Sequence, residues 1–514
     1  MHYFIYADAD ATLFEGESTQ SRNTGLDEIL EVRKDMNAAG TVINVSRALI
    51  KFDLTEISNL ISDGLIPDND FYEPSASYFL NLYDAGSTGL TSTSQLLYAN
   101  IVSQSWTAGE GTYNDDPETT DGVSWRYRIG QTDGTQWVSG NNDTGGTWYS
   151  GSALDSATAT ITITDYTELN AGDKVNLIAA DGTNYDFTNG DQSSVNGTWE
   201  SATSNNQTAT NLMNVINTSS GPAGTRFTAT AAGAVVTATQ ATAGTVGNTS
   251  VTLTDSGTAG MTKTDFSGGT WSEYGYVASQ SFDYDRYDMR MNVTEPISIL
   301  LDSSSAYPNN GFIIKRSGSV GNDDSNCPEG DSSEYGQFKF FSRDTNTIYQ
   351  PKLEVVWKDF SYDTAGITAA DSANTGSRTI NVLSGSQLDD VVFYMKGNRD
   401  SYKENSKIKF RLVGRERYPA KTYETTPRGL QINAFPSGTL FYSVKDALTE
   451  ETIIPFDQYT AVSCDTSGHY FNLWMNGLQA ERYYKLLYKL VIDSGTANEI
   501  NDIHDNDFTF KVEK

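Results

Sequence analysis

Alternation of apolar and polar side chains recurs along the whole chain and limits the possible folds more than any other feature of the sequence. In SRALIKFDL, which covers 46–54, the alternate positions from Ala48 to Leu54 are apolar, whereas Lys51 and Asp53 between them are charged. VSWRYRI, KIKFRL and FTFKV repeat this pattern further along. Because successive side chains of a strand point to opposite faces, each segment predicts a strand with one buried and one solvated face. Such strands are typical of antiparallel β-sandwiches rather than doubly wound parallel sheets.

Helical periodicity is scarce. The segment NQTATNLMNVINTS places Leu212, Val215 and Ile216 at helical spacing, and either Thr208 or Thr210 could begin the helix. The earlier segment ILEVRK fits a helix or a strand equally well. We therefore predict a mainly β chain with one short helix.

A change of composition sets residues 151–267 apart from their flanks. This stretch is rich in Ala, Thr, Gly and Asn, and the string GGTW brackets it at Gly145–Trp148 and at Gly268–Trp271. Two unrelated turn–strand junctions in a chain with 44 glycines would also repeat such a string. The coinciding change of composition favours instead a small α+β module, 149–271, inserted into a host loop, because loop tips tolerate inserted domains best.

A second boundary follows PKLEVVW, which predicts the closing strand of the host domain. The residues from there to about 376 are small and polar and lack periodicity, as in a linker. About half of the 35 Lys and Arg lie beyond them. We predict three domains: a discontinuous β-sandwich of 1–148 plus 272–358, the inserted module of 149–271, and a C-terminal immunoglobulin-like or fibronectin-like β-sandwich of 359–514.

The charge balance limits the partners of the chain. It carries 66 Asp and Glu against 35 Lys and Arg, a formal charge of −31. Such a surface repels nucleic acid, so we expect no nucleic-acid partner. Solubility explains the excess charge, and cation binding in acidic loops is the alternative. No apolar run approaches the ~18 residues of a membrane-spanning helix, and MHYFIYADADATLF does not read as a signal peptide.

Catalytic motifs are missing from the sequence. His2, His469 and His504 are scattered, and no nucleophile elbow, Walker loop, HExxH or paired-cysteine metal site is present. Cys327 and Cys464 lie far apart and indicate no disulfide framework. Most carboxylates lie in turn-like strings such as YNDDPETTDG, so a two-acid glycosidase is kept only as an alternative. We predict no enzyme activity and no catalytic residue.

The segment GNDDSNCPEGDSSEYG is the candidate cation site. Asp323, Asp324, Glu329 and Asp331 could supply the hard oxygen ligands that Ca²⁺ prefers. Their spacing is not that of an EF-hand, and a solvated acidic loop explains the same residues. No other cofactor is expected. The aromatic residues of WRYR and SEYGY could stack on sugars, although aromatic residues at strand spacing are more often part of a core.

Several phrases of the host segment occur in the order typical of one known family. ADADATLFEG and NTGLDEILEV look like its opening strand and asparagine-glycine stretch, and SRALIKFDL is similar to its arginine-led strand. QSWTAGEGTYNDDP and DGVSWRY look like its tryptophan segments, and FKFFSRDTNTIYQPKLEVVW like its ending. The host thereby resembles the DNRLRE family of β-sandwich domains over roughly 1–148 plus 272–358. The resemblance implies a sandwich related to carbohydrate-binding modules, although an inserted module departs from the simple family pattern.

The inserted segment has its own ordered phrases. AGDKVNLIAADGTNYDF predicts a hairpin turning at Asp181–Gly182, TATNLMNVIN a helix, and FTATAAGAVVTATQ a second hairpin turning near Ala232–Gly233. With the closing FSGGTW, the segment resembles a small α+β module of bacteriophage tail and virion proteins. The resemblance implies a virion protein that is assembled in the host cytoplasm and released by lysis. Its implied partners are other virion proteins and copies of itself, with a host-surface glycan as a further candidate.

The leading functional hypothesis is a non-enzymatic structural component of a phage tail, baseplate or neck. The alternatives are a receptor- or glycan-binding protein of a phage fibre and a polysaccharide depolymerase. A fibre is expected to show a repetitive shaft, heptads or collagen-like tracts, and a depolymerase a repetitive β-helix or a carboxylate-lined cleft. The sequence shows none of these repeats, which favours the structural role.

Overall fold

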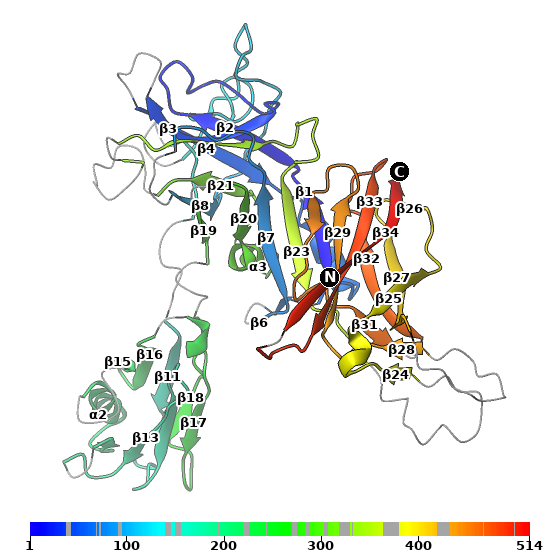
Figure 1. Ribbon diagram of the computed structural model, residues 1–514. Coiled ribbons are helices and arrows are strands. Elements are labelled where there is room, and N and C mark those ends of the chain that lie inside the picture. Colours follow the sequence, from blue (N-terminus) through cyan, green and yellow to red (C-terminus); the bar gives the residue numbers. More distant parts are fainter. Residues whose placement is uncertain are drawn as a thin grey trace, which may run out of the picture. The chain divides into compact units, whose positions relative to one another are not determined.

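The protein is described by a computed structural model (Figure 1). The structure describes residues 1–36, 43–67, 69–70, 73–90, 95–138, 145–149, 156–193, 196–218, 226–242, 244–269, 275–282, 287–302, 307–317, 329–330, 333–362, 380–418, 432–465, 467–497 and 499–514. Of these residues, 45% lie in strands and 9% in helices, so the predicted mainly β fold is confirmed. The chain divides into two compact units, Met1–Thr147 with Ser279–Lys514, and Trp148–Ala278. The second unit covers the residues of the predicted inserted module.

Two sheets of the first unit combine strands from both sides of the second unit in the sequence. The four-stranded sheet has the order β1 (His2–Tyr6), β23 (Lys352–Trp357), β7 (Ala76–Leu82) and β20 (Met289–Asn292). The larger sheet has the order β19 (Val277–Phe282), β8 (Gln95–Ile101), β21 (Phe312–Lys315), β4 (Ile43–Lys51), β3 (Ile29–Met36) and β22 (Gly336–Phe341), with β2 (Ala9–Phe14) paired to β4. Short pieces are β5 (Asn69–Asp70), β6 (Glu73–Pro74), β9 (Tyr127–Gly130), β10 (Thr135–Gln136), α1 (Thr55–Ser62) and α3 (Thr294–Asp302). The predicted closing strand PKLEVVW is β23, between β1 and β7.

Strand β4 differs from its prediction in part: Lys51 is half-buried and Asp53 after the strand is exposed, but residues 45–50 are buried on both faces. Leu49 and Arg47, which the alternation places opposite Ala48 and Ile50, are as buried as those residues. The strand lies in the middle of the larger sheet, and the charge of Arg47 is paired inside the protein. A charged residue in an alternating strand, such as Arg47, can therefore lie on a buried face when its charge is paired.

The helix prediction was incomplete. ILEVRK forms the strand β3, and the structure adds α1 and α3 to the one helix that the sequence predicted. α1 has eight residues and buries only Ile57, so its sequence shows too little helical periodicity to be recognised. Its start is fixed locally, because the Asp53 carboxylate accepts a hydrogen bond from the Thr55 N–H (2.9 Å).

The second unit consists of two four-stranded sheets and one helix around its own core. One sheet has the order β15 (Phe227–Ala232), β16 (Val235–Gln240), β11 (Thr158–Ile163) and β18 (Met261–Lys263), and the other β14 (Thr198–Trp199), β13 (Asn184–Asn189), β12 (Lys174–Ile178) and β17 (Val251–Thr254). A short 3-10 helix is η1 (Thr245–Gly247). The hairpins turn at Gly182 and Gly233, both with positive φ, as predicted. The core runs from Ala157 to Phe266 and includes the fully buried Trp199.

Helix α2 (Asn205–Asn217) confirms the predicted helix and packs on the sheet that contains β15 and β16 (Figure 1). Leu212, Val215 and Ile216 are its buried apolar residues, as their spacing predicted. The helix begins earlier than predicted, because Ser204 is the N-cap and its hydroxyl accepts from the Gln207 N–H. Thr208 lies in the first turn, where its hydroxyl accepts from the Ala202 N–H.

The C-terminal part forms a β-sandwich. One sheet has the order β24 (Ile380–Val382), β28 (Ile432–Ala434), β27 (Lys407–Glu416), β32 (Gly468–Trp474) and β31 (Ser463–Asp465), with β25 (Val391–Lys396) paired to β27. The other has the order β26 (Ser401–Lys403), β34 (Ile500–Glu513), β33 (Tyr483–Ile492), β29 (Leu440–Asp446) and β30 (Thr452–Ile454), and η3 (Gly385–Leu388) is a 3-10 helix. The two sheets share one hydrophobic core. The alternation predicted in KIKFRL is confirmed on β27, where Phe410 and Leu412 are buried.

Phe4 of β1 is a member of the core of this sandwich. A Cβ atom on Gly477 would lie 2.1 Å from the Phe4 ring, so glycine permits the close approach. Asn476 donates from its side chain to the Phe4 carbonyl oxygen. The first strand of the host sheet therefore also completes the C-terminal core, and the boundary predicted at 359 does not separate two independent cores.

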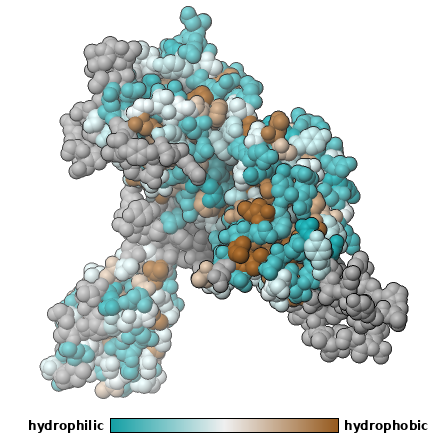
Figure 2. All heavy atoms as spheres, viewed as in Figure 1, coloured by the Kyte–Doolittle hydropathy of each residue, from teal (hydrophilic) through white to brown (hydrophobic). Residues whose placement is uncertain are grey.

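The visible surface is largely hydrophilic, as the charge of the chain leads one to expect (Figure 2). A group of apolar side chains stands out over the C-terminal sandwich in this view. Exposed apolar residues of this sandwich include Ile500 and Ile503 of β34, which are 58% and 56% exposed.

The free energy of unfolding of the native protein is expected to fall as the pH rises from about 4 to about 7, because the carboxyl group of Asp10 is buried. Asp10→Asn should not show this fall. Burial raises the pKa of Asp10 to about 7, although the Arg343 N–H donates to its carboxylate (2.7 Å) and opposes the shift. The folded chain thus keeps a proton that the unfolded chain releases near pH 4, so the free energy of unfolding falls across this range. Above pH 7 the variant should be more stable by up to about 4 kcal/mol. Urea unfolding at pH 4.5 and pH 8 measures this, with the exposed Asp8→Asn as control; parallel pH dependence of all three proteins would refute it.

Candidate functional site

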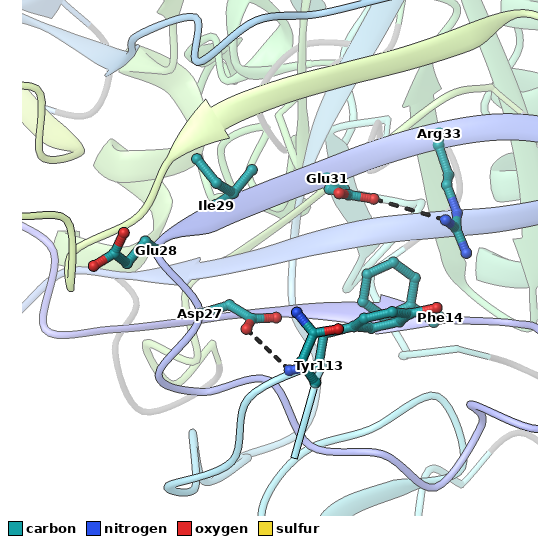
Figure 3. A pocket seen from close by; sticks show the side chains of 8 residues that line it. Phe14, Asp27, Glu28, Ile29, Glu31, Arg33 and Tyr113 are labelled. Carbon is teal, nitrogen blue, oxygen red and sulfur yellow. Dashed lines mark hydrogen bonds and ion pairs between the residues drawn. The ribbon is translucent and has the colours of Figure 1, made fainter. Parts of the chain in front are cut away.

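A pocket of about 230 Å³ opens beside the start of β3 (Figure 3). Its lining comes from β2, from β3 with the residues just before it, and from a loop far along the chain: Phe14, Asp27, Glu28, Ile29, Glu31, Arg33, Tyr113 and Asn114. Ile29, Glu31 and Arg33 line it together because alternate residues of β3 share one face. Tyr113 and Asn114 come from the loop in QSWTAGEGTYNDDP.

Asn23 joins the two loops that shape this pocket. Its side-chain amide donates to the carbonyl oxygens of Ala108 (2.5 Å) and Val123 (2.9 Å), and its Oδ1 accepts from the Gly111 N–H (2.7 Å). A Cβ atom on Gly25 would lie 2.4 Å from the Ala108 carbonyl oxygen, so only glycine fits there. The asparagine-glycine phrase and the tryptophan-glycine phrase of the sequence therefore pack on each other.

A second polar turn fixes the loop that carries Tyr113. The Asp115 carboxylate accepts from the Thr112 hydroxyl (2.6 Å), the Thr112 N–H (2.9 Å) and the Thr119 hydroxyl (2.7 Å). These hydrogen bonds, that of the Thr112 hydroxyl first, lower the pKa of Asp115 to about 2. The turn is therefore held together by a carboxylate that stays ionised at all but very low pH, and the pocket wall is ordered before any ligand arrives.

The pocket combines one unusual carboxyl group with a cation and the half-buried Tyr113 ring; the Phe14 ring that packs against Tyr113 is only 3% exposed. Burial raises the pKa of Asp27 to about 6, which the hydrogen bond from the Tyr113 N–H (3.0 Å) partly opposes. The Arg33 guanidinium lies 4.8 Å from the centroid of the Phe14 ring, and its Nη1 is 3.8 Å from Glu31 Oε2. The Phe14 and Tyr113 rings are 4.8 Å apart. Carboxylate acceptors, a guanidinium donor and an apolar wall together can bind a polyhydroxylated ring of modest size.

This pocket was not predicted from the sequence. The predicted aromatic candidates were those of WRYR and SEYGY. Trp125 is fully buried, Tyr127 is half-buried on β9, and Tyr274 lies outside the described residues. Tyr276 packs against Tyr149, with ring centroids 5.6 Å apart. The alternation of Ile29, Glu31 and Arg33 gave a signal for a polar strand face, but only the fold places Tyr113 beside it.

The candidate cation loop is described only at Glu329, and Asp323, Asp324 and Asp331 lie outside the described residues. Glu329 is buried and bound to two cations. Its carboxylate accepts from Arg47 Nη2 (2.7 Å) and Nε (3.2 Å) and lies 3.3 Å from Lys315 Nζ. Within the part of the chain that the structure describes, no group of three or more His, Cys, Asp or Glu could hold a metal ion. The surroundings of Glu329 are those of a structural ion pair, because both of its oxygens already face cations.

The Arg47–Glu329 pair joins parts of the sequence that are far apart. Arg47 Nη1 donates to the carbonyl oxygen of Gly145 (2.8 Å), and its guanidinium lies 4.7 Å from the Trp125 ring centroid. Gly145, the first residue of the first GGTW, has a positive φ, and a Cβ atom there would lie 2.5 Å from Trp125. The glycine of this string is therefore required by the host core itself.

The histidines serve packing contacts. His2 Nδ1 lies 2.7 Å from Glu354 Oε1 in the interior. His469 Nε2 accepts from the Phe435 N–H (2.8 Å), and burial lowers the pKa of His469 to about 4. His504 Nε2 lies 2.8 Å from Asp502 Oδ2. Each of these rings contacts a backbone N–H or a carboxylate in the described structure.

Comparison with protein-family models, with curated proteins and with solved structures finds no match. Among the described residues, no helix has the length and apolar character needed to cross a membrane.

Proposed function

We propose that this chain is a non-enzymatic structural component of a bacteriophage particle, in the tail, baseplate or neck. It would act through contacts with other virion proteins and with copies of itself. The observation that carries the proposal is the unit Trp148–Ala278, which has its own two sheets, helix and core. The same residues resemble modules of phage tail and virion proteins, and the host segment resembles a family found on virion proteins.

The use of buried charge supports a structural role. Arg47 and Glu329 pair in the interior, and Glu354 is approached by His2 and by Arg290 Nε (2.9 Å). The Arg47–Glu329 and His2–Glu354 pairs link segments that are 282 and 352 residues apart in the sequence. Titratable groups at catalytic sites usually lie in clefts with access to a substrate, whereas Arg47 and Glu329 are enclosed and bonded to each other.

Labelling of particles with an antibody against the purified chain tests this proposal. Negative-stain images should show the label at one position, the neck, tail or baseplate, on particles from a phage whose genome encodes the chain. The matched control is a particle from a strain in which the gene carries an early stop codon. Absence of label on intact and on gently disrupted particles would contradict the structural role.

Glycan binding is the second candidate function, and the pocket beside β3 favours it. Tyr113→Ala removes an aromatic wall and is expected to weaken binding of the cognate host-surface glycan about tenfold or more, because stacking and burial are lost together. Arg128→Ala, on the same sandwich but outside the pocket, is the control. Binding is measured by glycan array and then by calorimetry on the glycan found. If no surface glycan of the host binds the native protein, or if Tyr113→Ala and Arg128→Ala bind the glycan equally well, the pocket does not bind glycans.

An assay of reducing ends released from the same polysaccharides separates binding from hydrolysis. The raised pKa of Asp27 is a property that a general acid also needs, and Glu31 lies on the neighbouring wall. We expect no release of reducing ends from host polysaccharides. Hydrolysis that is lost in Asp27→Asn would establish the depolymerase alternative instead.

A further inference from the structure

A basic groove interrupts the otherwise acidic protein on the C-terminal sandwich. It has a volume of about 290 Å³ and is formed by the turn after β25 and the first half of β27. Five cationic side chains line it: Lys396, Arg399, Lys407, Lys409 and Arg411. No acidic residue is among the described residues of its lining, although the chain as a whole carries a formal charge of −31.

Only part of this positive charge is neutralised within the protein. Arg411 forms two hydrogen bonds with Asp465 (2.6 and 2.8 Å), and Lys409 Nζ lies 3.4 Å from the same carboxylate. For Lys396, Arg399 and Lys407 the described part of the chain supplies no carboxylate partner. Their heads are exposed, so the groove retains unpaired positive charge that an anionic partner can neutralise.

The turn that forms one wall of the groove, residues 397–400, is fixed by hydrogen bonds to the Tyr402 side chain. The Tyr402 hydroxyl accepts from the Arg399 N–H and donates to Asn398 Oδ1, both at 2.9 Å. The Tyr402 ring is buried against Phe410, with ring centroids 5.2 Å apart. Gly397 has a positive φ of 73°, which a turn of this kind requires. The backbone that carries Lys396 and Arg399 is therefore ordered.

The groove also borders an incomplete strand edge. β25 pairs only with the second half of β27, where Val391–Lys396 lie opposite residues 416 to 411. In the described structure, Lys407 to Phe410 are paired with β32 alone. An extended segment of polypeptide can bind beside such an edge through its main chain. Sugars and nucleic-acid bases need an accessible aromatic face, but Tyr402 and Phe410 in the groove are 8% and 2% exposed.

We propose that this groove binds an acidic loop of a second copy of this chain. Residues 377–514 contain nearly equal numbers of acidic and basic side chains, so the excess negative charge lies in the residues before them. Among the described loops, 110–121 presents exposed carboxylates at Glu110, Asp116 and Asp121 and is ordered by the Asp115 turn. A contact between two different surfaces of identical chains can be made reciprocally in a two-fold dimer, or can extend into rings or open chains. The inference adds a partner to the proposed structural role and rests on it.

Sedimentation velocity of the purified chain tests the inference independently of the particle. Near 0.1 M salt, where screening acts over about 10 Å, the chain should form a concentration-dependent series of oligomers. These should dissociate near 1 M salt, where the Debye length is about 3 Å. Lys396→Glu with Arg399→Glu should weaken association about tenfold or more, because the groove then repels the loop. Lys396→Glu alone should already weaken association, whereas Arg415→Glu, the same single charge reversal on β27 outside the groove, should leave association unchanged.

The reverse substitution identifies the loop. Glu110→Lys with Asp116→Lys should also abolish association, and mixing this variant with the Lys396→Glu, Arg399→Glu variant should restore it between the two. Circular dichroism and melting temperature show whether each variant is folded; all four positions are exposed. A chain that remains monomeric at low salt and high concentration, an equal effect of Arg415→Glu, or failure of the mixed variants to associate would overturn the proposal. Antibody labelling tests whether the chain is part of a particle, whereas sedimentation tests self-association, so failure of one proposal can be told apart from failure of the other.

Discussion

Glu329→Gln is expected to lower the free energy of unfolding by about 3–5 kcal/mol, the usual cost of removing one partner of a buried ion pair. Glu329 faces both Arg47 and Lys315, and the side chains of all three are at most 4% exposed. Glutamine has nearly the same shape but no charge, so the two buried cations would lose the carboxylate that they share. The loss should appear as a lower urea midpoint with an unchanged slope.

An exposed ion pair in the same unit is the matched control for this prediction. Asp390 and Arg417 lie 2.6 Å apart with side chains that are about half exposed, so Asp390→Asn should cost about 1 kcal/mol or less. Added Ca²⁺ should change neither midpoint, because the Glu329 oxygens are already bound to cations. A loss no larger than that of Asp390→Asn, or a calcium-dependent rise that Glu329→Gln abolishes, would show that Glu329 is not primarily a structural ion-pair residue.

Deletion of Tyr149–Trp271 is expected to leave a soluble, folded host protein. Tyr149 and Tyr276 lie side by side, with ring centroids 5.6 Å apart, so the two connections are already close at the ends of the deleted segment. The core of the second unit is formed by its own residues. Shortening a loop changes its closure entropy only slowly, by about 0.6 kcal/mol per halving, so the host should keep most of its stability. Its melting temperature and circular dichroism measure this.

A point variant inside the second unit provides the control. Trp199 is fully buried, and Trp199→Ala in the full chain should lower the stability of that unit by about 3–5 kcal/mol while the transition of the first unit stays in place. The excised segment 149–271 should also fold alone. If the deletion protein is insoluble and limited proteolysis of the full chain cuts within β11 to β18, the unit is not independent and the three-domain division fails.

The local sequence was sufficient to predict hairpins and helices, because their hydrogen-bond partners lie within a few residues along the chain. The hairpins at Gly182 and Gly233 were predictable because a glycine with positive φ and alternating flanks specify a turn. Helix α2 was predictable from the spacing of Leu212, Val215 and Ile216, but its start was not. Ser204 could be identified as the N-cap only once the backbone before the helix was seen to be extended.

The candidate pocket was not predicted. Glu31 and Arg33 lie in ILEVRK, whose sequence fits a helix or a strand equally well, so the shared strand face became evident only in β3. Their proximity to Tyr113 depends on Asn23, whose amide bridges two loops about 85 to 100 residues away in the sequence. No periodicity encodes such a contact, since it follows from the closing of the sandwich.

The sequence by itself determined the fold class of this protein, because alternation and turn residues act over a few neighbours and restrict the backbone directly. Only the tertiary structure decided which charges are buried and which cores are shared. Arg47 had the alternation of a solvated residue, yet it is enclosed because Glu329, some 282 residues later, neutralises it. Phe4 belongs to a strand of the host sheet, yet it fills the C-terminal core, where Gly477 leaves space for its ring. Burial of charge and sharing of a core depend on partners that are remote in sequence, and their free energy is gained only when the whole chain has folded.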